Sequence, residues 1–181
     1  ASYRHPLLLR RLSNRLVIAA PKLAGGEIVE ALNAATAVPV KFPQHDVDGE
    51  LVQALLERLL EVGADGMSIT DAVGVMVALT RGGVELEADA LDAVGDVVLM
   101  ALAARAAPTA RDRVLVQAIV LVEKMGLHRH PRAASCLKAV AQEIGRRGGL
   151  PASDPELLGQ VAGAIERALS DNGADTVALR I

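Results

Sequence analysis

Apolar positions recur along the chain with the spacing of helices rather than strands. Between residues 51 and 62 the leucines fall at positions i, i+4, i+5, i+8 and i+9, and charged side chains occupy other positions. Because about 3.6 residues make one helical turn, this spacing gathers the leucines on one face. The segment from 91 to 102 has a broader apolar surface. That breadth predicts a helix buried on two sides.

The apolar segments form two interleaved series with similar periods. The first series begins at residues 28, 69, 113 and 157, which lie 41, 44 and 44 residues apart. The second begins at residues 51, 91 and 133, with spacings of 40 and 42. Two series at nearly one period are typical of stacked two-helix units. We therefore predict an all-α fold of about seven helices stacked as helical-hairpin repeats, a short α-solenoid. A compact orthogonal bundle is the alternative.

Residues between the apolar segments agree with helix boundaries. Ser68 stands directly before the apolar segment that begins at residue 69, and Asp71 is three residues after Ser68. This spacing is similar to that of a capping box. The glycine pair at 82–83 follows the end of the same segment, where a left-handed C-cap is common. Glycines and N-cap residues recur in this way at other segment ends. The punctuation therefore supports separate helices of ordinary length.

Three parts of the chain follow from this pattern. Residues 1–25 form a basic N-terminal extension or helix, residues 26–172 form the helical-hairpin repeat domain, and residues 173–181 form a C-terminal tail. Within the repeat domain, residues 38–48 include Pro39 and Pro43. These prolines predict a loop between the first two helices. We interpret its end, from His45 to Asp48, as a solvated segment that supplies the next N-cap.

The composition favours helices and excludes several other classes. Hydrophobic residues make up 51% of the 181 residues, but aromatic residues only 1%. A β-sandwich or β-barrel normally uses many aromatic side chains. Cys136 is the single cysteine, so it cannot form an internal disulfide. The longest apolar runs are far shorter than the roughly 18–20 residues that span a bilayer. We therefore expect no membrane span.

Charge is distributed unevenly along the chain. The residues before Glu27 include five basic and no acidic side chains, whereas the remainder has 14 basic and 22 acidic residues and a net charge of −8. A basic, apolar and acid-free N-terminal segment resembles a mitochondrial transit segment. An ordinary amphipathic helix with a basic face explains it equally well.

Catalytic and metal-binding patterns are weak in this sequence. The closest approach to a metal site is His128 and His130 with Cys136, but no carboxylate or second cysteine stands at ligand spacing. We interpret this segment as a polar loop between helices and Cys136 as a small buried hydrophobe. We expect no enzyme activity, no metal and no cofactor.

The candidate functional residues are partner contacts. Asp89, Asp92 and Asp96 lie at i, i+3 and i+7, so they share one helical face and form an acidic stripe that suits a basic protein surface. A merely solvated face is the alternative for each of them. Tyr3 and Phe42, in a chain so poor in aromatic residues, lie in segments that flank the stack. These five side chains are the predicted contacts.

RNA binding is the competing function for a helical-repeat protein. Basic pairs near the predicted hairpin ends could contact phosphates, but the repeat domain is acidic and nearly free of aromatic side chains. We therefore favour protein binding over RNA binding. The basic pairs are Arg111 and Arg113, Arg129 and Arg132, and Arg146 and Arg147.

The repeats resemble a known group of proteins. The alternation of ITDAVGVMVAL (residues 69–79) with LDAVGDVVLMAL (residues 91–102) resembles degenerate organellar helical-hairpin repeats of the pentatricopeptide and octotricopeptide kind. The resemblance covers roughly residues 26–172, and its base-reading positions cannot be placed here. Size, acidity, the Arg-rich start and the helix number are similar to the pentatricopeptide-like accessory subunits of euglenozoan mitochondrial ATP synthase.

The resemblance implies a non-catalytic function in the mitochondrial matrix. Members of that subunit family attach to the α-subunit, on the outside of the catalytic head. We therefore expect an accessory or scaffold subunit whose partners are proteins of a larger complex. The alternative is an RNA-associated repeat protein of the mitochondrial ribosome or RNA-processing machinery.

Overall fold

The chain folds as a stack of helices. The computed structural model describes residues 6–41, 46–105, 111–148 and 155–171, and these contain eight α-helices and no strand. Three short 3-10 helices, Ala20–Lys22, Ala64–Gly66 and Leu127–Arg129, lie between them. The α-helices are α1 (Pro6–Ala19), α2 (Gly25–Lys41), α3 (Gly49–Val62), α4 (Ile69–Gly82), α5 (Ala88–Arg105), α6 (Asp112–Lys124), α7 (Ala133–Arg146) and α8 (Pro155–Asp171).

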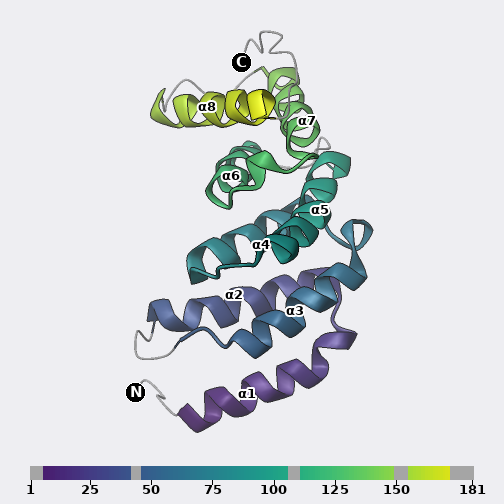
Figure 1. The fold of residues 1–181 in the computed structure, drawn as a ribbon, viewed down its shortest axis with the longest axis vertical. Coiled ribbons are helices and arrows are strands. Elements are labelled where there is room, and N and C mark those ends of the chain that lie inside the picture. Colours follow the sequence, from purple (N-terminus) through teal and green to yellow (C-terminus); the bar gives the residue numbers. More distant parts are fainter. Residues whose placement is uncertain (1–5, 42–45, 106–110, 149–154, 172–181) are drawn as a thin grey trace.

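The helices form two layers that alternate along the chain. One layer contains α2, α4, α6 and α8, and each of these packs on the next. The other contains α1, α3, α5 and α7 in the same order, so that α1 and α8 lie at opposite ends of the stack (Figure 1). The first layer's helices begin at residues 25, 69, 112 and 155, 44, 43 and 43 residues apart. The all-α prediction and its stacked repeats are confirmed.

The helix number and one boundary differ from the prediction. The described residues contain an eighth helix because α1 forms within the segment predicted as an extension or helix. The predicted loop from Val38 begins too early, since α2 continues through Pro39 to Lys41. A proline removes one backbone hydrogen bond and crowds the carbonyl group one turn earlier, but near the end of a long helix the other turns keep their hydrogen bonds.

Residues that the sequence indicated set the start of α3 and both ends of α4. The Ser68 hydroxyl accepts from the Asp71 amide (3.1 Å) and the Asp71 carboxylate accepts from the Ser68 amide (2.9 Å), which is a capping box at the start of α4. Gly83 closes the same helix in the left-handed region, at φ 59°. Asp48 caps α3 by accepting from the Leu51 amide (3.2 Å). The starts of α3 and α4 and the end of α4 therefore have local causes.

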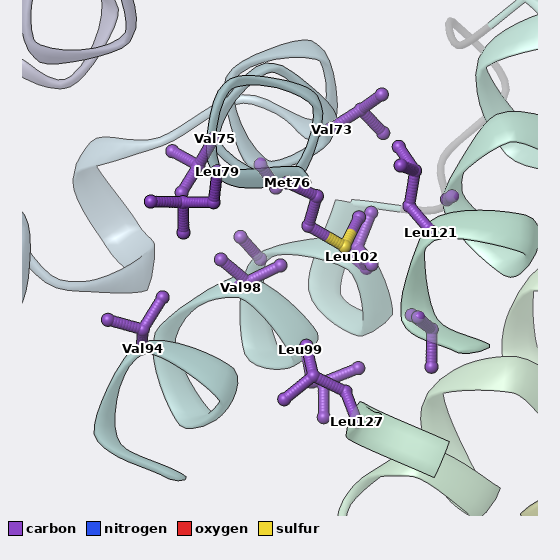
Figure 2. Packing of buried hydrophobic residues seen from close by; sticks show 14 of the residues in the cluster. Val73, Val75, Met76, Leu79, Val94, Val98, Leu99, Leu102, Leu121 and Leu127 are labelled. Atoms are coloured by element: carbon purple, nitrogen blue, oxygen red, sulfur yellow. The ribbon is translucent and has the colours of Figure 1, made fainter. Parts of the chain in front are cut away.

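The core runs through the stack between the two layers. Figure 2 shows Met76 and Leu79 of α4 facing Val98 and Leu102 of α5, with Leu99 directed toward the next unit. All five side chains are buried and belong to a single cluster. Each hairpin therefore relies on its neighbours for a complete core, as expected for a solenoid.

Glycine allows the closest approach between helices of one layer. A Cβ atom on Gly74 of α4 would lie 2.5 Å from Val29 Cγ1 of α2. Hydrogen bonds also join these two helices. Arg81 Nη2 of α4 donates to the Thr36 hydroxyl (3.0 Å) and to the backbone carbonyl oxygen of Asn33 (2.6 Å), both in α2. The pair α2 and α4 is thus the most extensive contact in the stack.

No helix among the described residues is long and apolar enough to cross a bilayer.

Candidate interaction site

The three aspartates of the predicted stripe are all exposed, but only Asp96 is paired with a described cation. Asp89 and Asp92 lie in the first turns of α5, both are exposed, and neither carboxylate forms a hydrogen bond or ion pair with another described side chain. Asp96 accepts a hydrogen bond from Arg132 Nε (2.5 Å), and its carboxylate lies 3.6 Å from His130 Nε2. Asp96 therefore also joins α5 to the start of α7. Tyr3 and Phe42 lie outside the described residues.

The exposed part of the stripe extends backward in the sequence. Glu85 and Glu87 in the connection before α5 are exposed, like Asp89 and Asp92, and none of the four is paired with a described cation. We call these four residues the acidic edge. The two glutamates are not among the predicted contacts, although their alternation with Val84 and Leu86 directly before the aspartates is a usable signal. The acidic edge is an unneutralised anionic surface.

A groove lies beside the acidic edge, between α3 and the start of α5. Its volume is about 580 Å³, and the connection before α5 forms one wall. Glu57, Glu85 and Glu87 line it, and no lysine, arginine or histidine is among the described residues that do so. We call it the α3–α5 groove. Its apolar lining includes Val47, Val52, Leu56, Leu60, Val84, Leu86, Ala90 and Val94.

The end helix α1 carries most of the large apolar side chains that the described residues expose. Leu7, Leu8, Leu12 and Ile18 are between 48% and 78% exposed. The opposite side of the helix packs on the core through Leu16 and Val17. Three arginines, Arg10, Arg11 and Arg15, are exposed on the same helix. We call these seven residues the outer face of α1.

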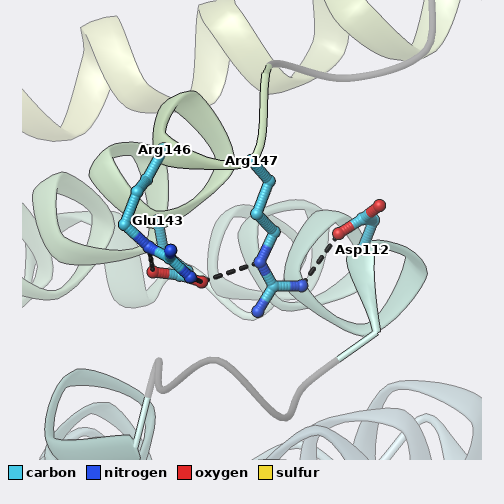
Figure 3. A network of polar contacts seen from close by, with 4 residues as sticks. All are labelled: Asp112, Glu143, Arg146 and Arg147. Carbon is cyan, nitrogen blue, oxygen red and sulfur yellow. Dashed lines mark hydrogen bonds and ion pairs between the residues drawn. The ribbon is translucent and has the colours of Figure 1, made fainter.

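Two of the predicted basic pairs supply residues to ion pairs within the chain. Arg146 donates from Nε and Nη2 to the Glu143 carboxylate (2.9 and 2.8 Å), and Arg147 donates from Nε to Glu143 (2.7 Å) and from Nη1 to Asp112 (2.8 Å). Figure 3 shows this network joining the end of α7 to the start of α6. Arg132 is paired with Asp96. These arginines therefore have structural roles that compete with phosphate binding.

The Glu143 network gives the fold a dependence on pH. Hydrogen bonds from Arg146 and then Arg147 lower the pKa of Glu143 from its ordinary 4.5 to about 2. A lowered carboxyl pKa stabilises the folded state above about pH 4.5, and this contribution is lost as the pH falls toward 2.

We expect Glu143→Gln to lower the urea midpoint at pH 7, with the difference from the unmodified chain shrinking below pH 4.5. Glu166→Gln, at an exposed position of α8, is the control, and an equal shift there would contradict the network's role.

The histidine and cysteine cluster is a packed corner of the fold. Cys136 is buried, and burial raises the pKa of its thiol to about 12. His130 is also buried, and its Nδ1 accepts from the Arg132 amide (3.2 Å). No group of three or more histidine, cysteine, aspartate or glutamate side chains suited to a metal ion occurs within the described ranges. The burial of Cys136 and His130 is therefore explained by packing between helices.

No family model, curated protein or solved structure matches this chain. Its function is therefore inferred from the acidic edge, the α3–α5 groove and the outer face of α1.

Proposed function

We propose that this chain is a non-catalytic accessory subunit of a mitochondrial protein complex, and that the complex is ATP synthase. In this function the helical-repeat surface binds the outside of the catalytic head, at the α-subunit. The proposal rests on one structural observation above others, the acidic edge. Four exposed carboxylates in the connection and first turns of α5 form a surface that attracts a basic protein partner and steers its approach.

The same edge disfavours nucleic acid. A surface that binds an RNA backbone needs unpaired cations, because the phosphates are anionic. The acidic edge repels phosphates, and Arg132, Arg146 and Arg147 are paired with carboxylates of the same chain. RNA association therefore becomes the outcome that the experiment must exclude.

The mitochondrial location and the named complex are supported by the sequence. The basic, acid-free segment before Glu27 is of the kind found in mitochondrial targeting. The size, the acidity, the Arg-rich start and the number of helices resemble those of the eighteen-kilodalton pentatricopeptide-like accessory subunit of euglenozoan ATP synthase. The two-layer stack supplies a regular scaffold on which the acidic edge is displayed.

The test compares complexes recovered from mitochondria with variants of the acidic edge. The tagged full chain is expressed in its source organism, and its complexes are separated on blue-native gels and identified by mass spectrometry, with and without RNase. We expect co-migration with ATP synthase that RNase does not change. We expect Asp89→Lys with Asp92→Lys to weaken the affinity for the complex about tenfold, a loss of about 1.4 kcal/mol, and to lower the recovery accordingly.

The matched control reverses two charges elsewhere. Glu30→Lys with Glu166→Lys changes the net charge equally at exposed positions on α2 and α8, and it should leave recovery unchanged. Association with ribosomal or RNA-processing proteins that RNase abolishes would overturn the proposal. So would equal losses in the two double variants, since the acidic edge would then have no specific role.

A further inference from the structure

Two surfaces of this chain are complementary in charge, and both have uncovered apolar side chains. The outer face of α1 has arginines among exposed leucines, and the α3–α5 groove has glutamates beside an apolar floor. We propose that the chain associates with a second copy of itself by placing the outer face of α1 in the α3–α5 groove of its neighbour. This goes beyond the accessory-subunit function: it uses α1 and Glu57, shares Glu85 and Glu87 with the acidic edge, and does not use Asp89 and Asp92.

The arrangement of residues on α1 selects the kind of surface that can cover it. Leu7, Arg11 and Arg15 follow each other at intervals of four residues and therefore form one row along the helix. Leu8 and Leu12 form the neighbouring row in the same way. The row with the two arginines thus lies directly beside the leucine row on the same exposed face. A lipid surface suits a helix whose basic and apolar faces are separated. This mixed face instead needs carboxylates and apolar side chains together.

The α3–α5 groove supplies both. Glu57 stands on the α3 wall, and Glu85 and Glu87 stand on the wall formed by the connection before α5. Between the walls the floor is apolar and includes Leu56 and Leu86, which are buried or partly buried. An amphipathic helix in an apolar groove is a common mode of protein recognition. Carboxylates at the edges of such a groove select a helix with basic residues.

Other ways of covering the outer face of α1 fit the charges less well. Two α1 helices placed face to face would bring Arg10, Arg11 and Arg15 of one copy against the same arginines of the other, and like charges oppose such pairing. The outer face of α1 cannot reach the α3–α5 groove of its own chain. Helix α1 packs against α3 through the opposite side, whereas the groove lies between α3 and α5. The complementary groove must therefore come from another copy.

The experiment measures self-association of the purified full chain and then exchanges the charges. Sedimentation velocity over a concentration series should show assembly of the unmodified chain that weakens with added salt. Arg11→Glu with Arg15→Glu should reduce the association constant at least about tenfold, and Glu57→Arg with Glu87→Arg should do the same. An equimolar mixture of the two double variants should assemble again, because the reversed charges are complementary.

Controls separate the proposal from loss of folding and from the proposed function. Circular dichroism at 222 nm verifies that each variant remains helical, and Glu30→Arg with Glu166→Arg should assemble like the unmodified chain. A chain that is monomeric at every concentration overturns the inference, and so does a mixture of the two double variants that stays monomeric. Both results concern only self-association of the purified chain. Failure of the proposed function is measured separately, by recovery of ATP synthase with the Asp89 and Asp92 variant.

Discussion

Replacing Leu99 with alanine is expected to lower the free energy of unfolding by about 2–5 kcal/mol. Leu99 of α5 is fully buried, at 0% exposure, and is directed toward Leu127 in the next unit of the stack (Figure 2). The substitution removes apolar atoms from a closed interior and leaves a cavity that surrounding helices fill only in part. Because Leu99 lies between neighbouring units, the loss weakens the cohesion between them.

The neighbouring residue provides a matched control for this prediction. Met100 occupies the next position on the same helix but is 44% exposed, so Met100→Ala should change stability by less than about 0.5 kcal/mol. Urea denaturation followed by circular dichroism at 222 nm measures both variants, with the slope of the transition compared as well as the midpoint. Equal losses for Leu99→Ala and Met100→Ala would show that this face of α5 is not buried as described.

The substitution Gly25→Ala is expected to destabilise the chain by about 1–3 kcal/mol. A Cβ atom at Gly25, the first residue of α2, would lie 2.4 Å from the carbonyl oxygen of Gly66. That oxygen belongs to the backbone, and it cannot move aside as a flexible side chain can. Relief therefore requires α2 to shift relative to the segment that leads into α4, which disturbs the tightest helix pair of the stack.

An adjacent glycine separates this contact from the general effect of adding a methyl group. At Gly26 the nearest atom to a new Cβ is Asp71 Oδ1 at 3.8 Å, an ordinary contact distance. Gly26→Ala should therefore be neutral or stabilising by up to about 1 kcal/mol, because alanine restricts the unfolded chain. Thermal unfolding of both variants tests the pair. A Gly25→Ala variant as stable as Gly26→Ala would refute the close backbone approach.

Most of the helical architecture could be predicted from local signals. The leucine stripe from 51 to 62, the capping box of Ser68 and Asp71, and the C-cap at Gly83 each depend on residues within a few positions of one another. Such signals act within one helix and survive in the folded chain. The end of α2 was predicted less well, because Pro39 weakens a helix locally while the continuing turns still support it.

The candidate interaction surfaces could be predicted only in part. Asp89 and Asp92 are exposed as the acidic stripe requires, since charged residues at helical spacing usually face water. The pairing of Asp96 with Arg132, 36 residues away, had no local signal. The exposure of the leucines of α1 could not be predicted either, because the sequence does not indicate whether a neighbouring helix will cover an apolar residue.

The amino-acid sequence by itself determined that this protein is built of helices in a repeating order, because periodicity and capping are properties of neighbouring residues. Only the tertiary structure decided which surfaces remain open. The α3–α5 groove exists because the stack places α3 beside α5, so that Glu57, Glu85 and Glu87 line one hollow. The network at Glu143 exists because Arg147 meets Asp112 across 35 residues. Those contacts depend on how the helices pack. Packing brings together residues that are far apart in the sequence, and no local sequence pattern predicts which of them will meet.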